Sequence, residues 1–306
     1  MKILLTGARG MVGMNVQEHP LAQRYELLCP SHDQLDLSHF KAVDEYLKQN
    51  SPDLIIHAAG RVGGIQANIK NPVEFLVQNV DIGRNVILAA QQNGIKKLIN
   101  LASSCLYPKQ APNPLTEDLI LTGPLEPTNE GYALAKIFAQ RLCAYIAHEF
   151  PEFQYKTLIP CNLFGRWDKF DPRHSHLLPA IIYKVHQAIL SGKDEIDVWG
   201  SGLARREFMY AGDLADCIYA CIERYNEVPA LMNVGLGVDH SINDYYQIVA
   251  RVLQFKGSFV HDLSKPEGMK QKLTSIQRAK EFGWSGKTSL EQGIRKAFEF
   301  YLEKGS

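Results

Sequence analysis

A tyrosine and a lysine four residues apart could move a proton onto a reacting oxygen. Tyr132-Ala-Leu-Ala-Lys136 lies in a segment, residues 132–150, whose apolar residues recur at helical spacing. A spacing of four places both side chains on one face of a helix. Tyrosine is neutral near pH 7, with a reference pKa of ~10, and a nearby ammonium lowers that pKa. The pair could therefore protonate a ketone oxygen while a hydride reaches the carbon.

A glycine-rich loop near the start of the chain could hold the hydride donor. It follows a short apolar run at residues 3–6 and opens a helical pattern. Its glycines allow a tight turn, close approach of the backbone to a pyrophosphate, and close helix packing. The helix N-terminus then faces the anion. We therefore expect a dinucleotide site that includes Gly7, Arg9, Gly10, Met11, Val12 and Gly13.

The residues after the second apolar run favour NADP(H) over NAD(H). Enzymes that use NAD usually place an acidic residue at the end of the second strand, where it binds the ribose hydroxyls. Here the sequence reads Leu28-Cys29-Pro30-Ser31-His32, without an acid. Arg9 in the glycine loop is placed to meet a 2′-phosphate. We expect NADP(H) as the cofactor.

Short apolar runs must position these residues. They fall at 3–6, 25–29, 53–57, 97–101 and 155–159, and helical patterns separate them, notably 40–49, 72–93 and 132–150. Strands that alternate with helices predict an α/β fold with a doubly wound parallel sheet of the Rossmann type. A ligand should bind outside the carboxyl ends of the strands.

The sequence changes character after residue 162, where Pro172, Pro179 and glycine turns predict shorter elements. Residues 203–236 return to a strand, a helix and a strand. A helix is expected at 241–255, with Ser241 as its N-cap and Asp244 three residues on, and a last one at 289–302. We therefore predict an NADP-binding domain from 1–162 and 205–236, and a smaller α/β substrate domain from 163–204 and 237–306.

Composition narrows the possible functions. The 306 residues contain 33 Lys and Arg and 33 Asp and Glu, which argues against a broadly basic nucleic-acid binder. No run approaches the ~20 apolar residues of a membrane helix. The six cysteines are scattered and include no CxxC pair, so we expect a reduced, cytoplasmic protein. His174 and His176 lack a carboxylate partner and predict no metal site.

The motifs together resemble the extended short-chain dehydrogenase/reductase superfamily, and within it the GDP-L-fucose synthase family. The GxxGxxG spacing, the YxxxK pair and Ser103 carry the wider resemblance. The narrower one extends over essentially the whole chain and rests on Ser103-Ser104-Cys105-Leu-Tyr-Pro108, Leu125-Glu-Pro-Thr-Asn129, Pro160-Cys-Asn162, Val198-Trp-Gly-Ser-Gly202, Arg206-Glu-Phe208 and Asn233-Val-Gly-Leu-Gly237.

The resemblance assigns roles to individual residues. It implies that Cys105 is the base and His176 the acid that epimerise the carbons beside a C4 ketone. Ser103 and Tyr132 would bind the ketone oxygen, and Lys136 the nicotinamide ribose. Further cofactor contacts are implied for Asp36, Leu37, Ala58, Ala59, Pro160, Asn162, Leu163 and His176. Contacts to a GDP-sugar are implied for Ser104, Asn162, Lys184, Trp199, Arg206 and Lys272.

Two positions depart from the family pattern. Lys184 stands where the family has an arginine, so the charge is kept and bidentate contact is lost. The segment Lys272-Leu-Thr-Ser275 ends in serine where the family has aspartate, which leaves the sugar specificity open.

The expected function is NADPH-dependent 3,5-epimerisation and C4 reduction of GDP-4-keto-6-deoxy-D-mannose to GDP-L-fucose. One alternative is C4 reduction of a related GDP-4-keto-sugar such as a 6-deoxyheptose, with or without epimerisation. Others are a sugar-nucleotide 4-epimerase that keeps NAD bound, and an inactive NADP-binding regulator. The resemblance also implies a homodimer formed through 72–93 and 132–150, with no nucleic-acid or membrane partner.

Overall fold

The computed structural model describes residues 1–170, 175–265 and 269–304. Its main sheet has six parallel strands in the order β10-β5-β4-β3-β1-β2. The sheet confirms the predicted α/β fold. Its strands are β1 (Lys2–Thr6), β2 (Glu26–Leu28), β3 (Leu54–His57), β4 (Lys97–Leu101), β5 (Gln154–Pro160) and β10 (Leu231–Val234).

The strand order fixes where a ligand can bind. From β1 the chain adds β2 on one side and then β3 on the other. A crevice forms where the order reverses in this way, beyond the carboxyl ends of the strands. Residues Gly7 and Ala58 follow β1 and β3 directly, so both lie at this reversal. The central strands β1, β3 and β4 are almost fully buried because helices cover both faces.

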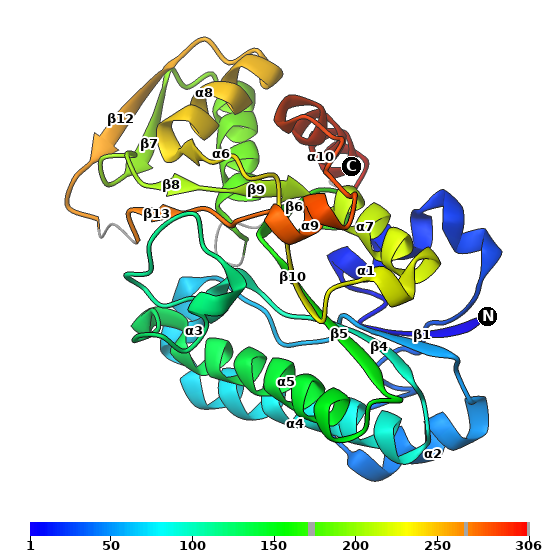
Figure 1. Cartoon of the computed structure of the whole chain (residues 1–306). Coiled ribbons are helices and arrows are strands. Elements are labelled where there is room, and N and C mark those ends of the chain that lie inside the picture. Colours follow the sequence, from blue (N-terminus) through cyan, green and yellow to red (C-terminus); the bar gives the residue numbers. More distant parts are fainter. Residues whose placement is uncertain (171–174, 266–268, 305–306) are drawn as a thin grey trace.

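Helices cover the two faces of the sheet unequally (Figure 1). On one face α1 (Met11–Glu18) packs against α7 (Ala211–Glu223). On the other, α4 (Pro72–Gln92) and α5 (Glu130–Glu149) lie side by side, and α2 (Phe40–Asn50) packs against α4. Of these helices, α2, α4 and α5 match the predicted ranges 40–49, 72–93 and 132–150, with ends that differ by at most two residues.

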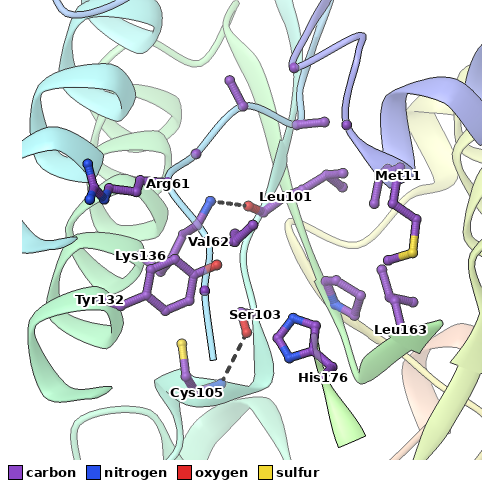
Figure 2. A pocket seen from close by; sticks show the side chains of 18 of the residues that line it. Met11, Arg61, Val62, Leu101, Ser103, Cys105, Tyr132, Lys136, Leu163 and His176 are labelled. Carbon is purple, nitrogen blue, oxygen red and sulfur yellow. Dashed lines mark hydrogen bonds between the residues drawn. The ribbon is translucent and has the colours of Figure 1, made fainter. Parts of the chain in front are cut away.

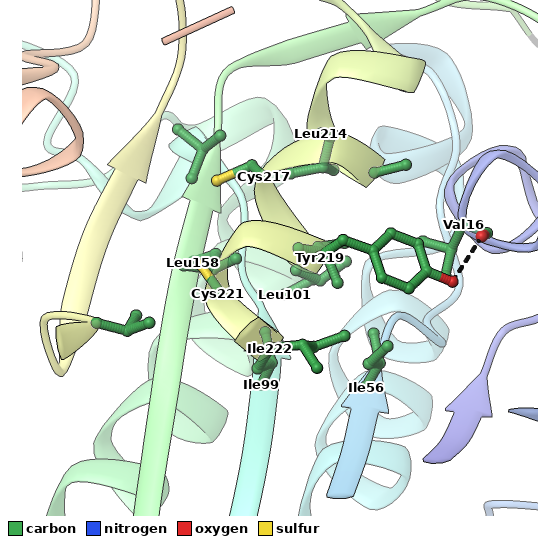
Figure 3. Close-up of a cluster of buried hydrophobic side chains, with 14 of the residues drawn as sticks. Val16, Ile56, Ile99, Leu101, Leu158, Leu214, Cys217, Tyr219, Cys221 and Ile222 are labelled. Atoms are coloured by element: carbon green, nitrogen blue, oxygen red, sulfur yellow. Dashed lines mark hydrogen bonds between the residues drawn. The ribbon is translucent and has the colours of Figure 1, made fainter. Parts of the chain in front are cut away.

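The helix α7 carries two of the cysteines into the core (Figure 3). Cys217 and Cys221 are fully buried among apolar side chains that include Leu158 and Ile99. The Tyr219 hydroxyl on the same helix donates to the Val16 carbonyl of α1 at 2.9 Å. All six cysteines are free. The four-residue spacing therefore places both thiols on one buried face of α7.

A second group of elements has its own apolar core, which includes Leu178, Ile182, Val198, Tyr245 and Ile294. Its helices are α6 (Leu177–Ser191), α8 (Ile242–Leu253) and α10 (Leu290–Lys304). Its strands form pairs or a small sheet: β6 (Asn162–Phe164) with β9 (Phe208–Tyr210), β7 (Glu195–Trp199) with β12 (Ser258–Asp262), and β8 (Arg205–Arg206) with β11 (His240–Ser241) and β13 (Gln271–Lys272).

Short helices connect these larger elements. They are α3 (Ile65–Lys70), α9 (Gln277–Glu281) and the 3-10 turns η1 (Pro20–Arg24), η2 (Ser104–Leu106), η3 (Glu117–Leu119), η4 (Pro127–Asn129) and η5 (Tyr225–Glu227). Across the described residues, every helix is too short or too polar to cross a lipid bilayer.

Two elements differ from the sequence expectation. The helix α6 runs through Pro179, where the sequence predicted a break. Pro179 is the third residue of α6, and proline is tolerated in the first turn because its missing N–H would have no partner there. The strand β8 falls within the segment 205–236 assigned to the cofactor domain, yet it pairs with β11 and β13.

The start of α8 agrees with the sequence in detail. Ser241 Oγ accepts the Asp244 amide at 3.0 Å, and the Asp244 carboxylate accepts the Ser241 amide at 2.8 Å. This reciprocal pair satisfies two amides at the start of the helix.

Candidate active site

A cavity of about 2060 Å³ runs along the carboxyl ends of the sheet strands. Its wall extends from the glycine loop after β1, past the start of α5, to Arg206 on β8 and Lys272 on β13. Figure 2 shows Tyr132, Ser103, Cys105 and His176 converging on one part of this space. Residues far apart in the sequence therefore share one site.

The glycine loop lies against the end of β3. Gly7 has a φ of +70°, and a Cβ there would come within 2.8 Å of the Ala58 carbonyl. A Cβ on Gly13 would come within 2.3 Å of the Gly7 carbonyl oxygen. No side chain of the described residues caps α1 at Gly10, so the first turn of the helix is open to the cavity it lines. This cradle fits the pyrophosphate of a dinucleotide.

The adenosine end of the cavity combines basic and acidic side chains. Arg9 lines the cavity, and so do Pro30, Ser31, His32 and Asp33 of the stretch that follows β2. Asp36 and Leu37 line it as well. The hydrogen bonds that Asp36 accepts from the Ser38 hydroxyl and amide, at 2.7 and 2.9 Å, lower the pKa of its carboxyl.

The start of α5 brings Tyr132 and Lys136 into the cavity. The Lys136 ammonium donates to the Leu101 carbonyl at 3.0 Å and is 8% exposed. Burial lowers the pKa of Lys136 to about 8. Burial also raises the pKa of Tyr132, while a hydrogen bond with Ser103 opposes that rise. Tyr132 is therefore a neutral, protonated phenol near pH 7.

Cys105 lies in the turn η2, four residues after the end of β4. Its amide donates to Ser103 Oγ at 3.5 Å, and its side chain is buried. Burial raises the pKa of the Cys105 thiol, whereas the nearby charge of Lys272 lowers it. The thiol thus has a basic neighbour that stabilises its anion. Ser104 is buried and lies outside the cavity lining.

His176 lines the cavity at the N-cap of α6. Burial lowers the pKa of its imidazole, and the charge of Lys169 acts in the same direction. The ring is therefore neutral near pH 7, with one nitrogen that can donate and one that can accept. His174 lies outside the described residues.

Two cations mark the far end of the cavity. Arg206 and Lys272 are register partners on the adjacent strands β8 and β13. The Arg206 guanidinium donates to the Met269 carbonyl at 2.6 Å, and burial lowers its pKa. Burial lowers the pKa of Lys272 as well. Trp199 also lines the cavity.

Lys184 lies apart from these cations. Its ammonium is 2.9 Å from the Asp197 carboxylate and 5.7 Å from the Trp199 ring centroid, and it is outside the cavity lining. The Lys184 side chain would have to leave Asp197 to reach a ligand.

The remaining residues predicted to bind the cofactor all line the cavity. Ala58 and Ala59 follow β3, and Pro160, Asn162 and Leu163 span the end of β5 and the start of β6. Ser275, which replaces the family's aspartate, lies outside the lining and donates its amide to the Leu115 carbonyl. The Ser275 side chain therefore contributes nothing to the cavity wall.

Several lining residues were absent from the sequence prediction: Arg61, Lys109, Glu126, Asn129 and Ser175. Glu126 and Asn129 occur in the motif before Tyr132, and Ser175 precedes His176. Their nearness in the sequence to residues predicted to be catalytic is the signal that could have identified them as part of the site. Lys109 and Arg61 lie in loops whose course the sequence did not predict.

The sheet, the glycine cradle and the Tyr132–Lys136 pair define a nicotinamide-dependent enzyme with the short-chain dehydrogenase/reductase arrangement. Residues 3–235 match the model of the NAD dependent epimerase/dehydratase family. The chain belongs to that family and is an NAD(P)-dependent enzyme.

Similar proteins cover the whole chain. It is 55% identical to the GDP-L-colitose synthase of Yersinia pseudotuberculosis over 99% of both chains. It is 47% identical to the GDP-L-fucose synthase of Azorhizobium caulinodans, over 98% of this chain and 96% of that one. The structure of MlghC, a GDP-mannoheptose C4 reductase from Campylobacter jejuni with NADP bound, is 28% identical with a TM-score of 0.88, over 98% of both chains.

Proposed function

We propose that this chain converts GDP-4-keto-6-deoxy-D-mannose to GDP-L-fucose with NADPH. Epimerisation at C3 and C5 would precede reduction at C4. The observation that carries the proposal is that Ser103, Cys105, Tyr132 and His176 line one cavity that continues to the glycine loop. A hydride donor, an oxygen-binding pair and two groups able to exchange protons with carbon would thus act on one ring.

The C4 ketone explains why one site can serve both reactions. It acidifies the hydrogens on C3 and C5, which Cys105 removes as base, while His176, in its protonated form, supplies a proton from the other face. Tyr132 and Ser103 hold the oxygen that carries the enolate charge. When bound, NADPH supplies the hydride for C4. Tyr132 then gives its proton to the same oxygen, and the charge of Lys136 stabilises the phenolate that remains.

We propose NADP(H) as the cofactor. Arg9 and His32 line the end of the cavity where an adenosine 2′-phosphate would lie, and a cation is needed there. The NADP bound to the Campylobacter jejuni relative supports the same choice.

A second candidate product is GDP-L-colitose. The 55% identity to a GDP-L-colitose synthase favours it. Colitose is a 3,6-dideoxy sugar, so its 4-keto precursor has a methylene at C3 and epimerisation would concern C5 alone. Cys105, His176 and Tyr132 would keep the same roles.

Incubation in deuterated water with NADPH tests these proposals. The substrates are GDP-4-keto-6-deoxy-D-mannose, its 3-deoxy counterpart and a GDP-4-keto-6-deoxyheptose. We expect GDP-L-fucose with deuterium at C3 and C5 from the first substrate, with the highest kcat/KM. NADPH consumption with an unlabelled, unepimerised product would leave a simple C4 reductase. A higher kcat/KM with the 3-deoxy substrate would favour the second candidate.

We also propose a homodimer formed through α4 and α5. These helices pack against each other and leave large apolar side chains exposed, including Val73, Val77, Leu134, Phe138 and Tyr145. An exposed apolar surface of this kind is typical of a protein interface. Light scattering on the purified protein should give twice the 34.4 kDa chain mass, and Val73→Glu with Phe138→Glu should give one chain mass.

A further inference from the structure

A fully buried carboxylate lies behind the two cations of the cavity wall. Glu207 directly follows Arg206, the last residue of β8, and is 1% exposed. Arg206 lines the cavity, whereas Glu207 lies outside the lining. Successive side chains of an extended chain point to opposite sides. Glu207 is therefore not placed to touch a ligand, and its contacts lie on the other side of the chain.

Four donors hold the Glu207 carboxylate. Its Oε1 accepts the Leu236 and Gly237 amides at 2.6 and 2.7 Å. Its Oε2 accepts the amide and the hydroxyl of Thr274 at 2.8 and 2.6 Å. A Cβ on Gly235 would clash with Oε1, so the glycine leaves room for the carboxylate. A buried carboxylate needs such donors, because its burial otherwise costs free energy.

These hydrogen bonds join segments that are far apart in the sequence. Leu236 and Gly237 follow the carboxyl end of β10, an edge strand of the main sheet. Thr274 is two residues beyond Lys272, the last residue of β13. The Glu207 side chain therefore ties β8 and β13 to the end of β10.

The pairing of β8 with β13 needs support from outside the two strands. Each strand has only two residues, so the ladder between them is short. Arg206 and Lys272 are register partners of like charge, an arrangement that destabilises a strand pair. Burial lowers the pKa of Lys272, and the charge of Arg206 acts in the same direction. Glu207 supplies a restraint that opposes the separation of the two cations.

We infer that Glu207 is a positioning residue that holds Arg206 and Lys272 side by side as a preformed receptor for the diphosphate of a nucleotide sugar. The inference rests on the proposed function, in which a GDP-sugar occupies this cavity. Bringing two cations together at the moment of binding would reduce affinity, whereas a receptor that is already ordered avoids that loss. Glu207 would thus act on binding through Arg206 and Lys272, without touching the ligand.

Glu207→Gln tests this role with little change in side-chain volume. Glutamine has one acceptor oxygen and one NH₂ group, so donors on one side of the former carboxylate lose their acceptor. Calorimetry on the NADP-loaded protein gives the Kd for GDP and for GMP, which lacks the second phosphate. We expect the Kd for GDP to rise by about ten- to a hundredfold and that for GMP by less than about threefold. The Kd for NADPH should stay within about twofold of the wild-type value.

Asp213→Asn is the matched control. Asp213 is a buried carboxylate on α7 that accepts the Lys287 amide at 3.1 Å and the amide and hydroxyl of Thr288 at 2.9 and 2.6 Å. It lies outside the cavity lining. Its replacement should leave the ratio of GDP to GMP affinity unchanged. An equal loss of GDP and GMP binding in Glu207→Gln would show a general structural role and overturn the inference, as would an unchanged Kd for GDP.

Thr274 keeps the inference testable if Glu207→Gln does not fold. Thr274→Val preserves the shape and the amide of the residue but removes the hydroxyl that donates to Glu207 at 2.6 Å. The Kd for GDP should rise by about three- to tenfold. Thr274→Ser keeps the hydroxyl and should restore GDP binding. Equal GDP affinity in the valine and serine variants would contradict the proposed role.

The wild type separates failure of this inference from failure of the proposed function. The ligands are GDP and GDP-L-fucose, titrated into the NADP-loaded protein. If the wild type binds neither, the proposed function fails and the inference fails with it. If the wild type binds both and Glu207→Gln binds them equally well, the inference fails while the proposed function stands. The expected result is wild-type binding of both ligands that Glu207→Gln weakens by a similar factor, because both carry the diphosphate.

Discussion

The buried ammonium of Lys136 donates a hydrogen bond to the main-chain carbonyl of Leu101 at 3.0 Å. Leu101 ends β4, so this bond ties the catalytic helix α5 to the strand that leads into Ser103 and Cys105. A positive charge inside a protein costs free energy unless it is compensated, and a neutral carbonyl compensates it only in part. The charged form of Lys136 therefore lowers the free energy of unfolding.

The burial of this charge predicts how the free energy of unfolding depends on pH. Burial lowers the pKa of Lys136 to about 8 in the folded chain, against an ordinary ~10.5 when unfolded. Between these values the unfolded chain binds more protons, so this residue makes stability rise with pH. The rise across the window should reach about 3 kcal/mol, because one pKa unit corresponds to about 1.4 kcal/mol. Urea unfolding of the cofactor-free protein from pH 7 to 10.5 measures it.

Lys136→Met provides the comparison. It fills a similar volume without a charge, so the rise attributed to Lys136 should disappear from its pH profile. The variant should equal or exceed the wild type in stability at pH 7 and lack reductase activity. Parallel stability profiles for the two proteins would contradict the assignment of a buried charge.

Cys105→Ser should separate epimerisation from cofactor binding. A serine hydroxyl stays protonated in this pH range, whereas a thiol can ionise to the thiolate that acts as the base, so deuterium uptake at C3 and C5 should fall by about a hundredfold or more. The Kd for NADPH should stay within about twofold of the wild-type value. Because burial raises the pKa of the thiol, wild-type exchange should also speed up as pH rises above neutrality. NMR of the substrate in deuterated water follows both.

Cys143→Ser is the control for that substitution. Cys143 is a buried cysteine on α5 outside the cavity lining. Its replacement should leave exchange unchanged. Full exchange activity in Cys105→Ser would show that another group is the base.

The sequence predicted the elements whose residue pattern is set by local secondary structure. Strands β1, β3, β4 and β5 are short apolar runs, and α4 and α5 have long helical periods, so pattern alone located them. The glycine loop and the Tyr132–Lys136 pair were recognisable because their spacing is fixed by geometry within one turn or one helix.

Features that depend on tertiary packing were not predictable in this way. Pro179 suggested a break, but its effect depended on whether it fell in the first turn of α6 or later. Lys184 faces Asp197 because β7 lies beside α6 in space, a relationship no local pattern encodes. The sequence also could not show that Asn129 makes no side-chain capping bond, because an asparagine at this position predicts a capped helix.

Arg9→Ala should reduce the preference for NADPH. Arg9 lines the cavity, as does the stretch after β2, and its charge would meet the 2′-phosphate of NADPH, which NADH lacks. The Kd for NADPH should rise by about tenfold, while the Kd for NADH stays nearly constant. Fluorescence titration with both cofactors measures the two values. Tight NADH binding without any preference for NADPH in the wild type would overturn the proposed cofactor.

Arg206 and Lys184 should differ in their contribution to substrate binding. Arg206 is half-buried in the cavity wall and its guanidinium is oriented by the Met269 carbonyl, so a bound diphosphate would meet a fixed partner. Lys184 must first break its 2.9 Å pair with Asp197. We expect Arg206→Met to raise KM for the GDP-sugar by about thirtyfold or more and Lys184→Met by about threefold.

Both variants should bind NADPH like the wild type. Equal increases in KM would mean that Lys184 moves to the diphosphate when substrate binds, as the sequence resemblance implies.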